Sequence, residues 1–168
     1  MLIFTNLMKF ISALILILLS VFVQAQSSSP KFDKVAFYTV MKIDDSLKIN
    51  EQLTILTIYK IKEKDIYVGA LLMKKAGMIT NLKIKLKDFK AGRKKLEDVL
   101  VKDSANTEYH FLRLMIQENA PKILNYNTEI DKDNLYIRKN FKSLSKELQE
   151  IVMDYSKHSK ALQNLNKQ

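Results

Sequence analysis

The sequence predicts an all-α fold, built from about seven helices arranged as antiparallel hairpins. The chain of 168 residues holds only three Gly and two Pro, too few for the many tight turns of a β-sandwich or barrel. From about residue 32 onward, apolar side chains recur at intervals of three and four residues, and short polar links separate the periodic segments. Helices joined by short connections satisfy both observations.

Residues 1–25 have the pattern of a signal peptide for export. Lys9 is their only charged residue, an apolar stretch from Phe10 to Leu19 follows it, and Ala25 is small enough for a signal peptidase site. The apolar core is about a dozen residues, whereas a helix needs ~20 to cross a bilayer. We expect cleavage after Ala25. Apolar residues before Lys9 lengthen the segment, so an uncleaved anchor is the alternative.

The remainder divides into a polar leader, residues 26–31, and a single helical domain, residues 32–165. With no Cys, the chain can form neither a disulfide, nor a thiolate metal site, nor a lipidated N-terminal cysteine. Because no second long apolar segment follows the signal, we do not expect an integral membrane protein after cleavage. The expected location is the periplasm or the medium outside a bacterial-type cell.

Each predicted helix begins or ends at a residue with a known boundary preference. Asp65 is expected to cap one helix and Gly77 to end it in a left-handed conformation. Pro121 interrupts the pattern, and Thr128 with Asp131 resembles a capping box. The expected helices span about 33–44, 47–61, 65–76, 81 or 88 to 101, 107–119, 121–126, 129–142 and 145–163. A strand at 53–61 is the alternative for the second segment, because apolar residues also alternate there.

The helix ending near residue 101 is amphipathic. Its apolar stripe and its basic stripe lie about a quarter-turn apart. The basic stripe contains Lys83, Lys87, Lys90 and Lys94, and is extended by Lys85, Arg93 and Lys95. Like charges four residues apart disfavour an isolated helix, so this stripe is a candidate binding surface for an anionic partner. A solvated face balanced by Asp88, Glu97 and Asp98 is the alternative.

Residues 89–106 resemble the second helix and exit loop of a tetratricopeptide repeat. The resemblance is carried by the aromatic Phe89, the small Gly92, the apolar Leu96 and Val99, and the turn from Asp103 to Asn106. The preceding segment, with Gly69 and Ala70, resembles the first helix of such a repeat.

The resemblance covers about residues 65–117 and amounts to one degenerate repeat. Gly92 replaces the usual Ala, Ser104 stands where Pro is usual, and Arg113 and Leu114 stand where the family has Leu-Gly. The connection between the two helices is expected to be about ten residues longer than in the family. The resemblance implies an array of helical hairpins with a concave protein-binding face, but no particular ligand.

Several polar residues fall at core positions of the helical pattern. Arg93 lies in the apolar stripe of its helix, while Glu108 and Asn119 lie in the apolar arc of the next. We expect Arg93 and Glu108 to form a partly buried pair across the hairpin. The alternative is that Arg93 extends to solvent along its aliphatic stem.

Arg113 and Gln117, together with His110, lie on the opposite flank of the helix expected at 107–119. They form a second, weaker candidate binding patch.

No catalytic or metal-binding motif is present. His110 and His158 lack the spacing of metal ligands, and the acidic residues from Glu129 to Asp133 lack the glycine and later ligands of an EF-hand. We therefore expect no metal, no cofactor and no enzyme activity.

The net charge of +10 favours anionic partners, but export and the lack of aromatic residues among the lysines disfavour nucleic acid. The expected function is an exported, non-enzymatic scaffold or interaction protein that binds a protein or peptide. The alternative is peripheral binding to anionic lipid or polysaccharide through the lysine stripe.

Overall fold

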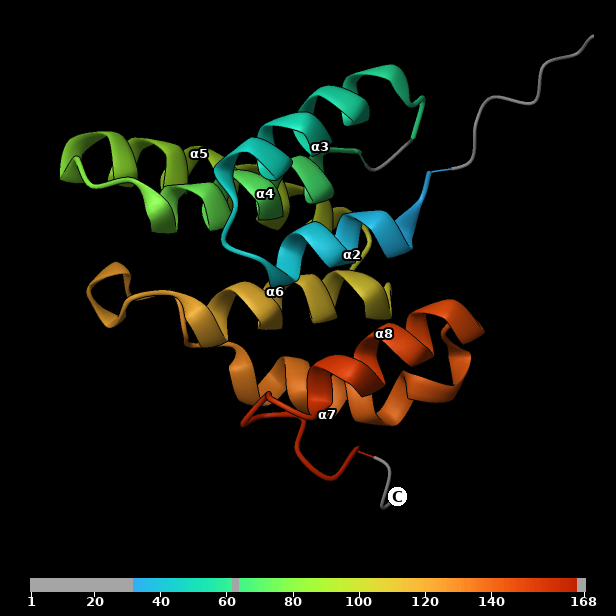
Figure 1. The fold of residues 1–168 in the computed structure, drawn as a ribbon. Coiled ribbons are helices and arrows are strands. Elements are labelled where there is room, and N and C mark those ends of the chain that lie inside the picture. The colour runs from blue at the N-terminus through green and yellow to red at the C-terminus, as the bar shows by residue number, and fades with distance from the viewer. Residues whose placement is uncertain (1–31, 62–63, 166–168) are drawn as a thin grey trace, which may run out of the picture. The chain divides into compact units, whose positions relative to one another are not determined.

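The computed structural model describes residues 32–61 and 64–165, which contain α-helices, two short 3-10 helices and no strand (Figure 1). The all-α prediction is confirmed. The predicted signal peptide and leader lie outside the described residues. The described elements are α2 (Lys34–Lys42), α3 (Ser46–Ile58), α4 (Lys64–Met78), α5 (Leu82–Lys102), α6 (Thr107–Asn119), η1 (Lys122–Leu124), α7 (Ile130–Asn140), η2 (Phe141–Ser143) and α8 (Lys146–Ser156).

Polar side chains cap the starts of most of these helices. Asn106 accepts a hydrogen bond from the Glu108 amide at the start of α6, and Ser145 accepts one from the Leu148 amide at the start of α8. Asp45 caps α3 in the same way. Because α3 is helical through Ile58, the strand alternative for residues 53–61 is wrong.

Three predicted boundaries are wrong. Gly77 lies inside α4 without a positive φ, so the helix continues to Met78. Asp65 lies in the first turn of α4, where it pairs with Lys95 at 2.8 Å. Thr128 forms no capping box, because α7 begins after Glu129, which makes no side-chain cap bond.

Several lengths also differ, and the helix expected at 121–126 is only the short 3-10 helix Lys122–Leu124. The connection between α4 and α5 is three residues, Ile79 to Asn81, and not an extended linker. The last helix ends at Ser156 instead of near residue 163.

Two glycines bring α4 and α5 into direct backbone contact. A Cβ added to Gly69 would lie 2.6 Å from the Gly92 carbonyl oxygen, and a Cβ on Gly92 would lie 2.6 Å from that of Gly69. The ion pair between Asp65 and Lys95 fits the same antiparallel alignment of α4 and α5. A tight α4–α5 hairpin therefore depends on the absence of a side chain at both positions.

Helix α6 lies at the centre of the packing. Every residue from Thr107 to Gln117 is buried. It contacts α4, α5 and α7, while the rings of Tyr38 and Tyr155 bring α2 and α8 against its Phe111. Such all-round burial is unusual for a helix that carries several polar residues, and it requires each charge to find a partner.

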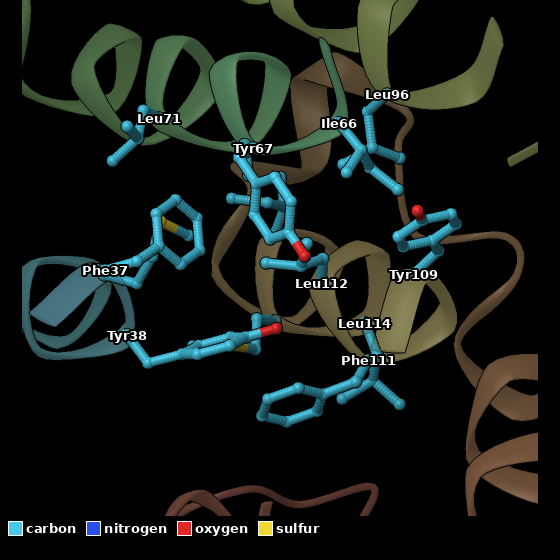
Figure 2. Close-up of a cluster of buried hydrophobic side chains, with 14 of the residues drawn as sticks. Phe37, Tyr38, Ile66, Tyr67, Leu71, Leu96, Tyr109, Phe111, Leu112 and Leu114 are labelled. Carbon is cyan, nitrogen blue, oxygen red and sulfur yellow. The ribbon is translucent and has the colours of Figure 1, made fainter. Parts of the chain in front are cut away.

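An aromatic core fills the space between α2, α4 and α6. Figure 2 shows Phe37 and Tyr38 of α2 and Tyr67 of α4 converging toward Leu112 and Phe111 of α6. The rings of Phe37 and Tyr67 meet edge to face, with centroids 5.1 Å apart. This core fixes α2 against the central helix, and so fixes one wall of the groove described next.

Candidate binding groove

A groove of about 670 Å³ lies between α2, α4, α5, α6, η1 and α8. This volume falls within the range typical of ligand-binding clefts. We name it the methionine groove, after four of its lining side chains: Met41 of α2, Met73 and Met78 of α4, and Met115 of α6. Other apolar lining comes from Phe89, Ile116, Pro121 and Leu124.

Methionine gives this groove an adaptable apolar lining. The side chain is unbranched and polarizable, so it adjusts to surfaces of different shape, and it is frequent at sites that bind varied peptides. Of the described methionines, only Met153 lies outside the groove lining.

Ion pairs mark the edges of the methionine groove. Lys42 of α2 pairs with Asp154 of α8, and Lys74 of α4 pairs with Asp44 at 2.9 Å. Hydrogen bonds from Lys42 and from Lys157 lower the pKa of Asp154 to about 2. Lys85 also lines the groove, but among the residues that the structure describes no carboxylate lies within ion-pairing distance of it.

The predicted lysine stripe lies on the exposed side of α5. Lys83, Lys87, Lys90 and Lys94 are all exposed, which agrees with the helical spacing. Lys94 pairs with Asp98 at 2.5 Å, one turn along the same helix, and this bond lowers the pKa of Asp98. Lys83, Lys87, Lys90 and Lys94 do not line the methionine groove. Among the lysines of α5, only Lys85 does.

The predicted pair between Arg93 and Glu108 is wrong. Arg93 is exposed and lies over the ring of Tyr126, 4.7 Å from its centroid. Glu108 is buried, as its spacing predicted, but Asn119 is exposed.

The carboxylate of Glu108 has partners from two other helices. It pairs with Lys34 of α2, and it accepts hydrogen bonds from the hydroxyls of Tyr38 at 3.2 Å and Tyr67 at 3.0 Å. Burial, followed by the charge of Glu108, raises the pKa of Tyr38. Glu108 thus fastens the start of α6 to both α2 and α4.

Arg113 and Gln117 do not form a surface patch, because both are buried. Arg113 donates to both carboxylate oxygens of Asp133, from Nε at 2.8 Å and from Nη2 at 2.7 Å, and its Nη1 donates to Glu97 at 3.1 Å. Burial alone would lower the pKa of Arg113, but the bonds to Asp133 and Glu97 outweigh it and raise the pKa. The Gln117 Oε1 atom is buried with no hydrogen-bond partner in the described part of the chain.

His110 belongs to the same buried network. Its Nδ1 lies 2.7 Å from an Asp133 oxygen, and its Nε2 lies 2.9 Å from the Ser104 carbonyl oxygen. Asp133 thus contacts both His110 and Arg113, Arg113 also contacts Glu97, and the network joins α5, α6 and α7.

Tyr126 extends this network toward the surface. Its hydroxyl donates to Glu97, and burial together with the nearby Glu97 charge raises its pKa. Arg93, over the same ring, is its outermost member. The network is thus a structural link between helices, and its charged groups are satisfied internally.

Within residues 32–61 and 64–165, no group of three or more His, Asp or Glu side chains is arranged to hold a metal ion. No helix in that part of the chain is both long enough and apolar enough to cross a bilayer.

The sequence matches no protein family model, and no curated protein and no solved structure is detectably similar to it. The methionine groove is therefore characterised by its own geometry and chemistry. Sequence reasoning missed it, because its walls come from five helices and a 3-10 turn that lie far apart in the chain.

Proposed function

We propose that this chain is an exported, non-enzymatic interaction protein that binds an apolar segment of a partner protein or peptide in the methionine groove. The observation that carries the proposal is the convergence of four methionines from three helices on one groove. Met41, Met73 and Met115 are buried at 5%, 2% and 4% exposure and Met78 is half-buried, so an apolar partner that enters the groove covers the atoms that remain exposed there.

The edges of the groove indicate the chemistry of the partner. Lys42 and Lys74 are already neutralised by Asp154 and Asp44, whereas Lys85 has no carboxylate partner among the described residues. A bound segment with an acidic side chain near its apolar anchors would pair with Lys85. We therefore infer that the partner segment is an amphipathic helix with two or more large apolar residues and an adjacent Asp or Glu.

Two expectations from the sequence form part of the same proposal. The predicted signal peptide at residues 1–25 would deliver the protein to the periplasm or beyond. The resemblance of residues 65–117 to a tetratricopeptide repeat supports a role in binding proteins, since helical hairpin arrays use concave faces in this way.

The test is selection of displayed random peptides on the immobilised full chain, followed by titration of a synthetic copy of the enriched peptide. Methyl groups of ¹³C-labelled methionine serve as the readout. We expect the signals of Met41, Met73, Met78 and Met115 to shift on titration, while that of Met153 does not. Enriched peptides should combine helically spaced apolar residues with an acidic residue.

A plugging variant, Gly77→Leu, sharpens this test. A Cβ at Gly77 meets nothing within 4 Å, and Gly77 lines the groove, so a leucine there enters open space without disturbing the packing. We expect Gly77→Leu to weaken peptide binding more than tenfold and the matched Gly77→Ala to leave it nearly unchanged. Equal binding by wild type and Gly77→Leu, or unmoved groove methyls, would contradict the proposal.

A further inference from the structure

The first turns of α5 combine exposed apolar and basic side chains. We define this basic tip as Leu82, Lys83, Ile84 and Lys87. We propose that the basic tip docks onto the surface of a bilayer that contains anionic phospholipids. This inference goes beyond the proposed peptide binding and does not depend on it.

The apolar residues of the basic tip are unusually open to solvent. Leu82 is 60% exposed and Ile84 is 49% exposed. At 100° per residue, Lys83 and Lys87 lie between Leu82 and Ile84 around the helix. Leu82 and Ile84 both lie in the first turn, so the end of α5 can place both apolar side chains in the interfacial region of a bilayer, while the lysines on the arc between them extend along their aliphatic stems to the phosphates.

The charge of α5 is divided between its two ends. Residues 82–90 contain four lysines and one aspartate, whereas residues 97–103 contain one lysine and three acidic residues. Lys94 and Lys95 form ion pairs with Asp98 and Asp65. In the described part of the chain, no carboxylate lies within ion-pairing distance of Lys83 or Lys87. The basic tip therefore keeps its positive charge available for an anionic surface.

The exposed apolar residues favour a bilayer over a soluble anionic polymer. An acidic polysaccharide would attract the lysines equally well, but it offers no apolar phase for Leu82 and Ile84. The basic tip also lies beside the methionine groove, because Lys85, in the same turn of α5, lines the groove. Docking would thus hold a groove-bound partner next to the membrane.

The absence of Trp from the sequence allows a site-specific test in the full chain. Leu82→Trp places a single fluorophore in the basic tip. Val101→Trp is the matched control, because Val101 is an exposed apolar residue at the acidic end of the same helix, 79% open to solvent. Each variant is mixed with vesicles of neutral phosphatidylcholine, with or without about a third phosphatidylglycerol and with brominated acyl chains as quenchers. Residues 1–31 are identical in both variants, so they contribute equally.

We expect Leu82→Trp emission to shift to the blue and to be quenched on the anionic vesicles only, with both changes weakened by added salt. Val101→Trp should stay exposed to water. With Leu82→Trp as reporter, Lys83→Gln with Lys87→Gln should weaken binding about thirtyfold. Ile84→Ser should weaken it severalfold.

Two results would overturn the proposal. The first is a Leu82→Trp signal that remains water-exposed on anionic vesicles. The second is binding that responds to the lysine substitutions but not to Ile84→Ser, and that a soluble acidic polysaccharide reproduces, since this would assign the tip to a polymer.

Discussion

Gly69 and Gly92 touch backbone to backbone, because either residue given a Cβ would place it 2.6 Å from the carbonyl oxygen of the other. We expect Gly69→Ala and Gly92→Ala each to lower the free energy of unfolding by about 2–3 kcal/mol, since helix backbones must move apart to admit the methyl group. Chemical denaturation followed by circular dichroism measures the change.

Gly77→Ala is the control for this prediction. Gly77 lies in the last turn of the same helix and meets open space, so alanine should raise the free energy of unfolding by about 0.5 kcal/mol through helix propensity. Similar destabilisation at all three positions would show that the close approach of α4 and α5 is not what requires glycine.

The ion pair between Lys42 and Asp154, at the edge of the methionine groove, predicts that Asp154 titrates at a lower pH than an ordinary aspartate. In the folded protein the pKa of Asp154 is lowered to about 2 from the ordinary 3.8 by bonds to Lys42 and Lys157. The contribution of this pair to stability is therefore present above about pH 4 and is lost as the pH falls toward 2. Carboxyl ¹³C NMR should report a midpoint near 2 for Asp154.

Substitution of each lysine separates the two bonds. Lys42→Met and Lys157→Met should each raise the Asp154 midpoint part of the way, and the double variant should raise it close to 3.8. A midpoint that stays near 2 in the double variant would refute this assignment.

The buried charge network around Asp133 predicts a large loss of stability when that single side chain loses its charge. Asp133→Asn keeps the shape of the side chain but removes the charge opposite Arg113 and His110, so we expect a loss of about 3 kcal/mol in the free energy of unfolding. Combining it with Arg113→Met should recover part of the loss, because no unpaired buried arginine then remains. An additive double variant would mean that the two groups do not interact.

Replacement of Gln117 by an apolar residue is expected to raise stability. Its Oε1 atom is buried without a partner among the described residues, so Gln117→Met, which is similar in volume, should raise the free energy of unfolding by about 1 kcal/mol. Thermal denaturation provides the measurement, and Gln52→Met, at another buried glutamine, provides the comparison. Clear destabilisation by Gln117→Met would show that the amide makes a bond essential to the fold.

Local pattern predicted the helices well, because apolar spacing and capping residues act within one turn. Residues 107–119 were expected to be helical and are so to the residue. The prediction that Gly77 ends its helix was wrong, because a glycine permits a left-handed cap without requiring one, and the helix here continues to Met78.

Partners distant in sequence were not predictable in this way. The period predicted that Glu108 is buried, but its partner Lys34 lies 74 residues away and cannot be read from a helical repeat. The methionines of the groove fall on ordinary core-facing positions of their helices, so periodicity does not distinguish a groove wall from a closed interior.

The burial of α6 determines how the protein is expected to unfold. In an array where each hairpin touches only its neighbours, an end can fray while the rest stays intact. Here the helices both before and after α6 cover it, so detaching either group would expose a helix that carries Glu108, His110 and Arg113 without their partners. The described helices should therefore unfold in a single cooperative transition, and neither the hairpins before α6 nor those after it should survive as an independent fragment.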